Sequence, residues 1–209
     1  MRICFVGDSL TNGTNDEEFR GWSGRLCAGE CARGHQLTHY NLGIRAETSK
    51  DIEKRWRAEC SPRLLDVHQG ALVFSFGVND MAIQNGDTTR VSRKQSVEAA
   101  KRILGEAKQW KPTLWIGPMP VDDTQQPFHS APGVSYNFST DRLAGLCQDY
   151  QALAREMGIP YLAILKPLLD NDGWKNSFSQ GDGVHPTGKG YALIADAVTS
   201  WSAWRAWLD

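Results

Sequence analysis

Four polar residues in this sequence have the types needed for nucleophilic attack on an acyl group. Ser9 follows the apolar run RICFV, Asn79 lies in GVND, and Asp182 and His185 are three residues apart in GDGVHP. A serine hydroxyl is a weak nucleophile near neutral pH, so it needs a base and a third group that orients the base. Ser9 is therefore either a nucleophile presented at the end of a strand or the cap of an ordinary strand-to-helix turn.

The spacing of Asp182 and His185 suits the first alternative. The two residues lie in a turn that contains glycine, so the carboxylate can fold back onto one imidazole nitrogen and leave the other free to face Ser9. Acyl transfer also needs hydrogen-bond donors for the developing oxyanion, each worth roughly 3 kcal/mol of barrier. The Asn79 amide, the Ser9 backbone N–H and an N–H in the loop after the second predicted strand are the candidates. We interpret Asp80, next to Asn79, as a structural residue that hydrogen-bonds nearby loops.

Five short apolar runs alternate with helical segments along the chain. The predicted strands are 2–6, 37–42, 71–77, 113–117 and 159–165, and the predicted helices are 22–34, 48–68, 92–110, 139–158 and 188–208. Within 48–68, Pro62 marks a break or a second helix start. Strands that alternate with helices indicate a parallel sheet covered on both faces, which is a three-layer α/β/α sandwich. A single domain over residues 1–209 is expected, because no linker-like segment divides the chain.

The strand order expected at this size is the flavodoxin-like 2-1-3-4-5. In such sheets, ligands bind at the carboxyl edge where the first and third strands diverge. Ser9 follows the first predicted strand, Asn79 follows the third, and Asp182 and His185 precede the last helix at the same edge. The order therefore predicts that all four side chains meet in one crevice.

The motifs GDSL, NLGIRAETS, GVND and DGVHP occur here in the order seen in SGNH, or GDSL, hydrolases, and the chain resembles that family over nearly its whole length. The resemblance implies that Ser9 is the nucleophile, His185 the general base, Asp182 its orienting acid and Asn79 an oxyanion donor. It also implies the SGNH hydrolase fold and a reaction without a metal or an organic cofactor.

One segment departs from the family pattern. Where the family usually has a glycine whose N–H donates to the oxyanion, this sequence has Ala46 in AETS. Alanine can supply the same main-chain donor, although a positive φ there would add roughly 1 kcal/mol of strain. Gly43 is the alternative donor, but we interpret it as a turn glycine. Arg45, beside this segment, is either an exposed loop arginine or a contact for a polar or anionic substrate group.

The loop 118–138 is long for an α/β protein and leaves the fourth predicted strand at the catalytic edge. We expect it to form one wall of the pocket, with Phe128, Val134 and Tyr136 in contact with substrate.

Three tryptophans in the last predicted helix, Trp201, Trp204 and Trp207, recur at every third residue. Packing of that helix on the sheet explains them better than a membrane contact, and a dimer contact stays open.

Composition and net charge limit the kinds of partner that the protein is expected to bind. The net charge of -1 and the dispersed Lys and Arg residues give no footprint for nucleic acid or an anionic membrane. No apolar run approaches the roughly 18 residues that span a bilayer, and no room for a signal peptide precedes the first predicted strand. The odd number of cysteines indicates reduced thiols in a cytoplasmic protein. Cys27, Cys31 and His35 could share a helical face, but a buried helix face explains them better than a metal site.

The sequence thus predicts a serine hydrolase that cleaves a small-molecule carboxylic ester through an acyl-enzyme on Ser9. The acyl group could be acetyl or another short chain, from a lipid or a sugar, and the motifs fix neither this nor the oligomeric state. A non-catalytic binding module of the same fold for an acylated ligand is the main alternative. A nucleotide binder of flavodoxin-like fold fits less well, because the turn after the first strand lacks a Gly-rich phosphate fingerprint.

Overall fold

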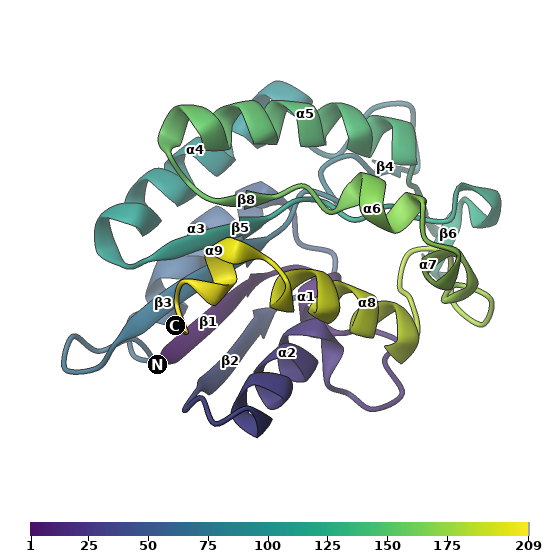
Figure 1. Ribbon diagram of the computed structural model, residues 1–209. Coiled ribbons are helices and arrows are strands. Elements are labelled where there is room, and N and C mark those ends of the chain that lie inside the picture. Colours follow the sequence, from purple (N-terminus) through teal and green to yellow (C-terminus); the bar gives the residue numbers. More distant parts are fainter. Residues whose placement is uncertain (209) are drawn as a thin grey trace.

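The central sheet has five parallel strands in the order β2-β1-β3-β5-β8. The computed structural model describes residues 1–208 (Figure 1). The strands are β1 (Arg2–Gly7), β2 (Thr38–Gly43), β3 (Gly70–Ser75), β5 (Thr113–Ile116) and β8 (Tyr161–Leu162). Counted along the chain within this sheet, the order is 2-1-3-4-5, as predicted from the sequence.

The register aligns the carboxyl ends of the three strands that lead to the predicted site. Gly7, the last residue of β1, pairs with Gly43 of β2 on one side and with Ser75 of β3 on the other. The loops that follow these strands therefore start side by side at one edge of the sheet. Residues 3 to 6 of β1 and all of β3 are buried, as expected for apolar strands covered on both faces.

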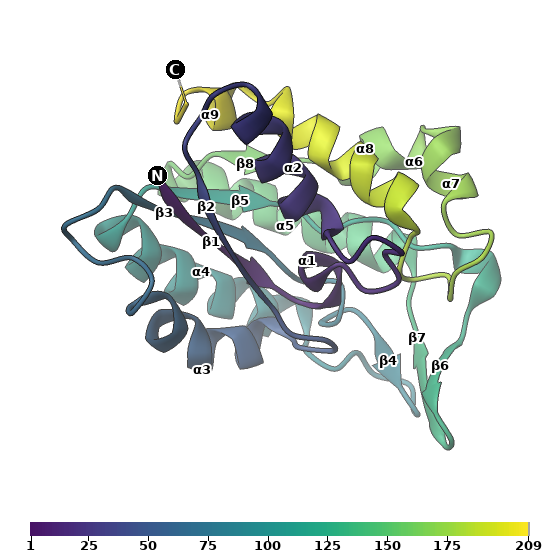
Figure 2. The same cartoon turned by 90° about the horizontal axis from the view of Figure 1, so that it is seen from below.

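Helices cover both faces of this sheet. The longer ones are α2 (Gly21–Ala32), α3 (Ser49–Cys60), α4 (Arg93–Trp110), α5 (Thr140–Met157) and α8 (Gly188–Thr199), and short ones are α1 (Ser9–Asn12), α6 (Leu165–Leu169), α7 (Asp172–Asn176) and α9 (Ser202–Arg205). Figures 1 and 2 show α2, α8 and α9 on one face and α3, α4 and α5 on the other. No helix within residues 1–208 is long and apolar enough to cross a bilayer.

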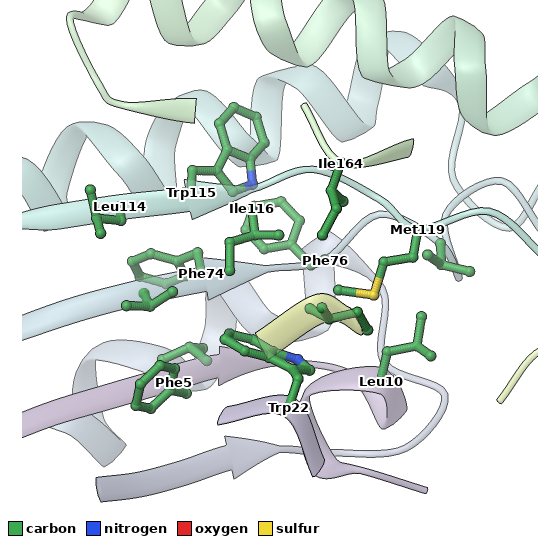
Figure 3. Packing of buried hydrophobic residues seen from close by; sticks show 14 of the residues in the cluster. Phe5, Leu10, Trp22, Phe74, Phe76, Leu114, Trp115, Ile116, Met119 and Ile164 are labelled. Atoms are coloured by element: carbon green, nitrogen blue, oxygen red, sulfur yellow. The ribbon is translucent and has the colours of Figure 1, made fainter. Parts of the chain in front are cut away.

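Aromatic side chains fill the space between the layers. Phe5 of β1 packs edge-to-face on Trp22 of α2, with ring centroids 5.4 Å apart. On the opposite face, Phe76 contacts Trp115 of β5 and Tyr150 of α5 at 5.6 and 5.9 Å. Figure 3 shows Phe5 and Trp22 on one side of this core and Phe76 and Trp115 further along the sheet. Burial of these large rings stabilises the packing of helices on both faces of the sheet.

A second, three-stranded antiparallel sheet was not predicted. It consists of β4 (Ile83–Gln84), β7 (Val134–Asn137) and β6 (Phe128–Ala131), in that order. The hairpin of β6 and β7 extends away from the main sheet beside β4 (Figure 2). The segment expected as a loop over 118–138 is therefore partly ordered in strands, preceded by a short 3-10 helix (Asp123–Gln125).

Three other predicted elements have different bounds. The helical segment expected over 48–68 ends at Cys60, next to the break expected at Pro62, and helix does not resume before β3. The strand expected over 159–165 is limited to 161–162, since Leu165 already begins α6. The helix expected over 188–208 is interrupted after Thr199 and resumes as α9. Within α9, Trp204 is fully buried, and its ring centroid lies 6.4 Å from that of Phe5. This part of the tryptophan pattern therefore packs over the sheet as expected.

Candidate active site

Ser9, His185 and Asp182 form a continuous chain of hydrogen bonds. The Nε2 atom of His185 lies 2.8 Å from Ser9 Oγ, and its Nδ1 atom lies 2.7 Å from Asp182 Oδ2. A carboxylate only accepts hydrogen bonds, so an ionised Asp182 places the proton on Nδ1 and leaves Nε2 as an acceptor for the serine hydroxyl. Ser9 and His185 are almost fully buried, with 6% and 4% of their surfaces exposed.

The turn that carries Asp182 and His185 is held by the carboxylate itself. Asp182 Oδ1 accepts the backbone N–H groups of Val184 and His185 at 2.9 and 2.8 Å. Gly183, between Asp182 and Val184, has φ +75°, a left-handed conformation that glycine adopts without strain. Burial alone would raise the pKa of Asp182, but the hydrogen bonds and charge of His185 outweigh burial and lower this pKa below 3.8.

Asp8, and not Ser9, caps the short helix α1. Its Oδ1 accepts the Leu10 N–H at 3.0 Å, and its backbone is extended, as at other helix N-caps. The Ser9 hydroxyl therefore does not cap α1 and is directed to His185. A cap was the alternative interpretation of Ser9, and the structure assigns that role to its neighbour.

Asn79 contacts this same turn through its side-chain amide. Its Nδ2 donates to Asp8 Oδ2 at 3.3 Å, and Asn79 lines the pocket that also contains Ser9 and His185. Burial, together with the nearby negative charge of Asp80, raises the pKa of Asp8 to about 7 despite the hydrogen bonds that it accepts. The buried pair of Asp8 and Asn79 was not predicted, because nothing in the two separate motifs shows which side chains meet.

Ala46 has the left-handed backbone that its glycine-like position suggested, with φ +64°. Within residues 1–208 its N–H donates to no protein acceptor, and the residue lines the same pocket as Ser9. The N–H of Gly43, in contrast, donates to Asn41 Oδ1 at 2.9 Å. Of the two candidate oxyanion donors, Ala46 therefore has the available group.

Gly43 is not a turn glycine, and that interpretation was wrong. It is the last residue of β2 and pairs with Gly7. A Cβ atom at this position would lie 2.2 Å from the backbone nitrogen of Asn12 and 2.7 Å from the carbonyl oxygen of Asp8. Glycine is needed because β2 passes directly against α1, the helix that carries Ser9.

Two sets of interactions, one buried and one partly buried, fix the loops around the site. Asp80 Oδ2 accepts the backbone N–H of Ser49 at 2.9 Å, and the Ser49 hydroxyl donates to Asp80 Oδ1, so the loop after β3 is bound to the start of α3. Arg55 of α3 contacts Glu47 and donates to the Gly7 carbonyl at 3.0 Å. Asp80 was expected to bind nearby loops, whereas the bridge through Arg55 was not anticipated.

A cavity of about 160 Å³ opens at Ser9. Its walls include Leu10, Phe128, Tyr136 and Phe138, and the Phe128 ring lies edge-on to His185 at 5.9 Å. The expected wall from the segment 118–138 is therefore present. Val134, expected to contact substrate, is not among the lining residues, whereas Ser130 and Phe138, which were not singled out, are.

Arg45 lies at the exposed rim of the same cavity. Cys27 and Cys31, the thiols of the possible metal pattern, differ in environment, since Cys27 is buried and Cys31 is exposed. Within residues 1–208, no group of three or more His, Cys, Asp or Glu side chains is arranged to hold a metal ion.

Comparisons with known proteins agree with this architecture. Residues 5–193 match the model of the GDSL-like lipase/acylhydrolase family. No curated protein sequence matches the chain. Similar solved structures include the lipase/acylhydrolase from Enterococcus faecalis, at 22% identity and a TM-score of 0.78, which covers 98% of this chain and 96% of that one.

Two esterase structures have the same fold at lower identity. The psychrotrophic esterase EstA from Pseudoalteromonas is 16% identical with a TM-score of 0.72, and the match covers 99% of this chain and 98% of that one. A catalytic mutant of Axe2, an acetylxylan esterase from Geobacillus stearothermophilus, is 16% identical with a TM-score of 0.70, covering 94% and 91%. The TM-scores show a shared fold and, at these identities, no more than the fold, whereas the family model matches most of the sequence. The chain therefore belongs to the GDSL-like lipase/acylhydrolase family and is a carboxylic ester hydrolase.

Proposed function

We propose that this protein cleaves esters of short acyl groups through an acyl-enzyme on Ser9. The observation that carries the proposal is the hydrogen-bonded chain from Ser9 Oγ through both nitrogens of His185 to Asp182, at 2.8 and 2.7 Å. These distances lie within the range for proton transfer between a nucleophile and its base.

In the first half of the reaction, Ser9 Oγ attacks the acyl carbonyl carbon while His185 Nε2 takes the hydroxyl proton. The resulting oxyanion accepts hydrogen bonds from the N–H groups of Ser9 and Ala46 and from the Asn79 amide. When the tetrahedral intermediate collapses, the C–O bond to the alcohol breaks and His185 returns the proton to the departing oxygen. The acyl group is then bonded to Ser9.

In the second half, a water molecule takes the place of the alcohol. His185 removes one of its protons as the water oxygen attacks the acyl carbon, and the same donors bind the new oxyanion. Collapse releases the carboxylic acid and returns the proton to Ser9 Oγ. Asp182 keeps the imidazole in one tautomer and stabilises its positive charge in both halves.

The size and lining of the cavity support a short acyl group. Its volume of about 160 Å³ is well below the roughly 300 to 1,000 Å³ of sites that enclose drug-sized ligands. Phe128, Tyr136 and Phe138 give it an aromatic wall suited to a small apolar chain. We expect kcat/KM for p-nitrophenyl esters to be highest for acetate to butyrate and to fall for octanoate, and a rise with chain length would contradict this assignment.

Labelling with a fluorophosphonate probe tests the catalytic role of Ser9. The probe forms a covalent bond only with an activated serine, so the unaltered protein is expected to be labelled and Ser9→Ala is not. Ser177→Ala is a matched control, because Ser177 is a buried serine whose hydroxyl donates to the Trp174 carbonyl. If the unaltered protein resists labelling, the protein is a non-catalytic binding module and the proposal is wrong.

We also propose that the protein works in a reducing compartment such as the cytoplasm. All five cysteines are free thiols, and burial raises the pKa of Cys27 and of Cys147 to about 12. Cys31, in contrast, is an exposed free thiol, and such thiols stay unpaired where the compartment keeps them reduced. Cell fractionation with a tagged chain tests the location, and recovery from an oxidising compartment would contradict it.

A further inference from the structure

Arg90 lies next to the proposed oxyanion donor without an ion pair of its own. It belongs to the segment between β4 and α4, and its Nη1 donates to Asn79 Oδ1 at 3.4 Å. Its backbone N–H donates to the Ala82 carbonyl at 2.9 Å, which anchors the segment. Within residues 1–208, no carboxylate lies within salt-bridge distance of its guanidinium, unlike that of Arg25 or Arg55.

The two partners of the Asn79 amide have opposite hydrogen-bonding character. Asp8 Oδ2 receives a hydrogen bond from Asn79 Nδ2, and Arg90 donates one to Asn79 Oδ1. A guanidinium can only donate and an ionised carboxylate can only accept. If the amide were turned by 180°, its oxygen would face the carboxylate and its NH₂ group would face the guanidinium.

The amide is thus held in one orientation from both ends. One N–H of the Asn79 NH₂ group is used by Asp8, and the second is left for the pocket that Ser9 and Ala46 also line. Arg90 supplies the part of this selection that does not depend on the protonation of Asp8. Preorganised donors are more effective than mobile ones because they need no reorganisation as the oxyanion forms.

Arg90 also connects the amide to the second sheet. Its guanidinium carbon lies 5.4 Å from the ring centroid of Tyr136 in β7, a distance suited to a cation–π contact. Tyr136 lines the cavity together with Asn79. The hairpin of β6 and β7, which forms the aromatic wall, is therefore in contact with the oxyanion donor through a single side chain.

We propose that Arg90 is a positioning residue, which acts through Asn79 by fixing the direction of its amide toward the oxyanion. The proposal rests on the role of Asn79 in the proposed function. Arg90 touches neither the substrate nor Ser9, so its loss lowers kcat and leaves KM nearly unchanged, because the donor matters most when negative charge develops.

The test is a double-mutant cycle with p-nitrophenyl acetate as substrate. Arg90→Met is expected to lower kcat about tenfold, the size expected for a lost hydrogen bond to a charged group, with KM changed less than about twofold. Asn79→Ala is expected to lower kcat by about 10²- to 10³-fold. In the Asn79→Ala background, Arg90→Met should have no further effect on kcat, because the group that it positions is gone.

Arg142→Met is the matched control. Arg142 also binds the loop after β3, by donating to the Met81 carbonyl at 2.9 Å, but it has no hydrogen bond to Asn79. Any effect of this substitution on kcat should therefore be the same factor in the unaltered and the Asn79→Ala backgrounds. Thermal melts identify variants that do not fold, and Arg90→Leu, which also lacks a hydrogen-bond donor, replaces Arg90→Met if the latter is unfolded.

Two results would overturn the inference about Arg90. One is a kcat for the folded Arg90 variant equal to that of the unaltered protein, and the other is an equal loss in both Asn79 backgrounds. The proposed function fails separately, through an Asn79→Ala variant of undiminished kcat or an unlabelled Ser9. If Asn79→Ala lowers kcat as expected but the Arg90 substitution has no effect on kcat, the inference about Arg90 is rejected and the proposed function is retained.

Discussion

Asp182 binds His185 twice, through the imidazole and through the backbone. One carboxylate oxygen lies 2.7 Å from Nδ1, and the other accepts the His185 N–H at 2.8 Å. The same residue therefore shapes the turn and selects the tautomer of the proposed base. Separating these two functions requires a substitution that keeps the shape of the side chain and removes its charge.

Asp182→Asn makes this separation. The Asn oxygen can still accept the backbone N–H groups, but its NH₂ group faces Nδ1 and moves the imidazole proton to Nε2, opposite Ser9. We expect kcat for p-nitrophenyl acetate to fall by about 10⁴-fold with little change in the melting temperature. Asp172→Asn, at an exposed aspartate paired with Lys175, is the control and should keep full activity. A kcat within tenfold of the unaltered value would contradict the assigned role of Asp182.

The lowered pKa of Asp182 also predicts how stability and activity depend on pH in acid solution. A carboxyl whose pKa is depressed by folding stabilises the protein above its unfolded pKa of about 3.8 and loses this contribution as the pH falls through its lower folded value. Loss of activity that depends on protonation of Asp182 should therefore begin only below about pH 4. A titration midpoint above about pH 4 for the Asp182 carboxyl, followed by NMR of its side-chain carbon, would contradict this interpretation.

The pKa of Asp8 is shifted in the opposite direction to that of Asp182, so its effect on stability has the opposite dependence on pH. Its pKa is raised to about 7, so between about pH 4 and pH 7 the folded protein binds a proton that the unfolded chain releases, and stability falls as the pH rises. Asp8→Asn removes this dependence. The free energy of unfolding of the variant relative to the unaltered protein should rise by about 1 kcal/mol per pH unit across this interval, as measured by urea titration. A difference that is constant with pH would show that Asp8 stays ionised.

Ala46→Gly tests the backbone strain in the oxyanion loop. At φ +64° an alanine costs roughly 1 kcal/mol that glycine avoids, and the N–H donor is kept. We expect the free energy of unfolding to stay unchanged or rise by up to about 1 kcal/mol, with activity maintained, because the gain is partly offset by the entropy of an unfolded glycine. Ala152→Gly, at an exposed position of α5, should instead lose about 1 kcal/mol. An equal loss of unfolding free energy in Ala46→Gly and Ala152→Gly would contradict the strain assigned to Ala46.

Gly43→Ala tests the close approach of β2 to α1. The new Cβ would lie 2.2 Å from a backbone atom of Asn12, so the helix with Ser9 must shift. A loss of about 1 to 3 kcal/mol of stability is expected, together with a reduced kcat. Gly105→Ala, within α4, should be tolerated or stabilising, because the nearest atom to its Cβ is the end of the Met157 side chain at 3.7 Å. The steric account fails if the two variants melt at the same temperature.

The sequence predicted the main sheet well because β1, β3 and β5, which form its centre, are mainly apolar runs that are buried almost throughout. It also placed Ser9, Asn79, Asp182 and His185 together, since each lies in a short motif next to the end of a strand or the start of a helix. The carboxyl edge of a parallel sheet then brings such positions to one place. Their catalytic roles are the proposal made above, which the experiments on Ser9 and Asp182 test.

The second sheet escaped prediction for a physical reason. Its strands have two to four residues, none of them fully buried, so neither alternation nor an apolar run marks them. They exist because β7 pairs with both neighbours, and β4 is about fifty residues away in the chain. The contact of Arg90 with Asn79 was missed for a similar reason, since its loop has no motif and only the folded chain brings the two side chains together.

The proposed nucleophile and its proposed base come from opposite ends of the sequence, 176 residues apart. During synthesis, Ser9 emerges early and has no base until the turn with His185 has been translated and has docked against β1. Any partly assembled chain in which α8 is detached from the sheet thus has a chemically inert serine. The first appearance of ester cleavage in a refolding experiment would therefore mark the docking of the last segment, and the enzyme would report the completion of its own folding.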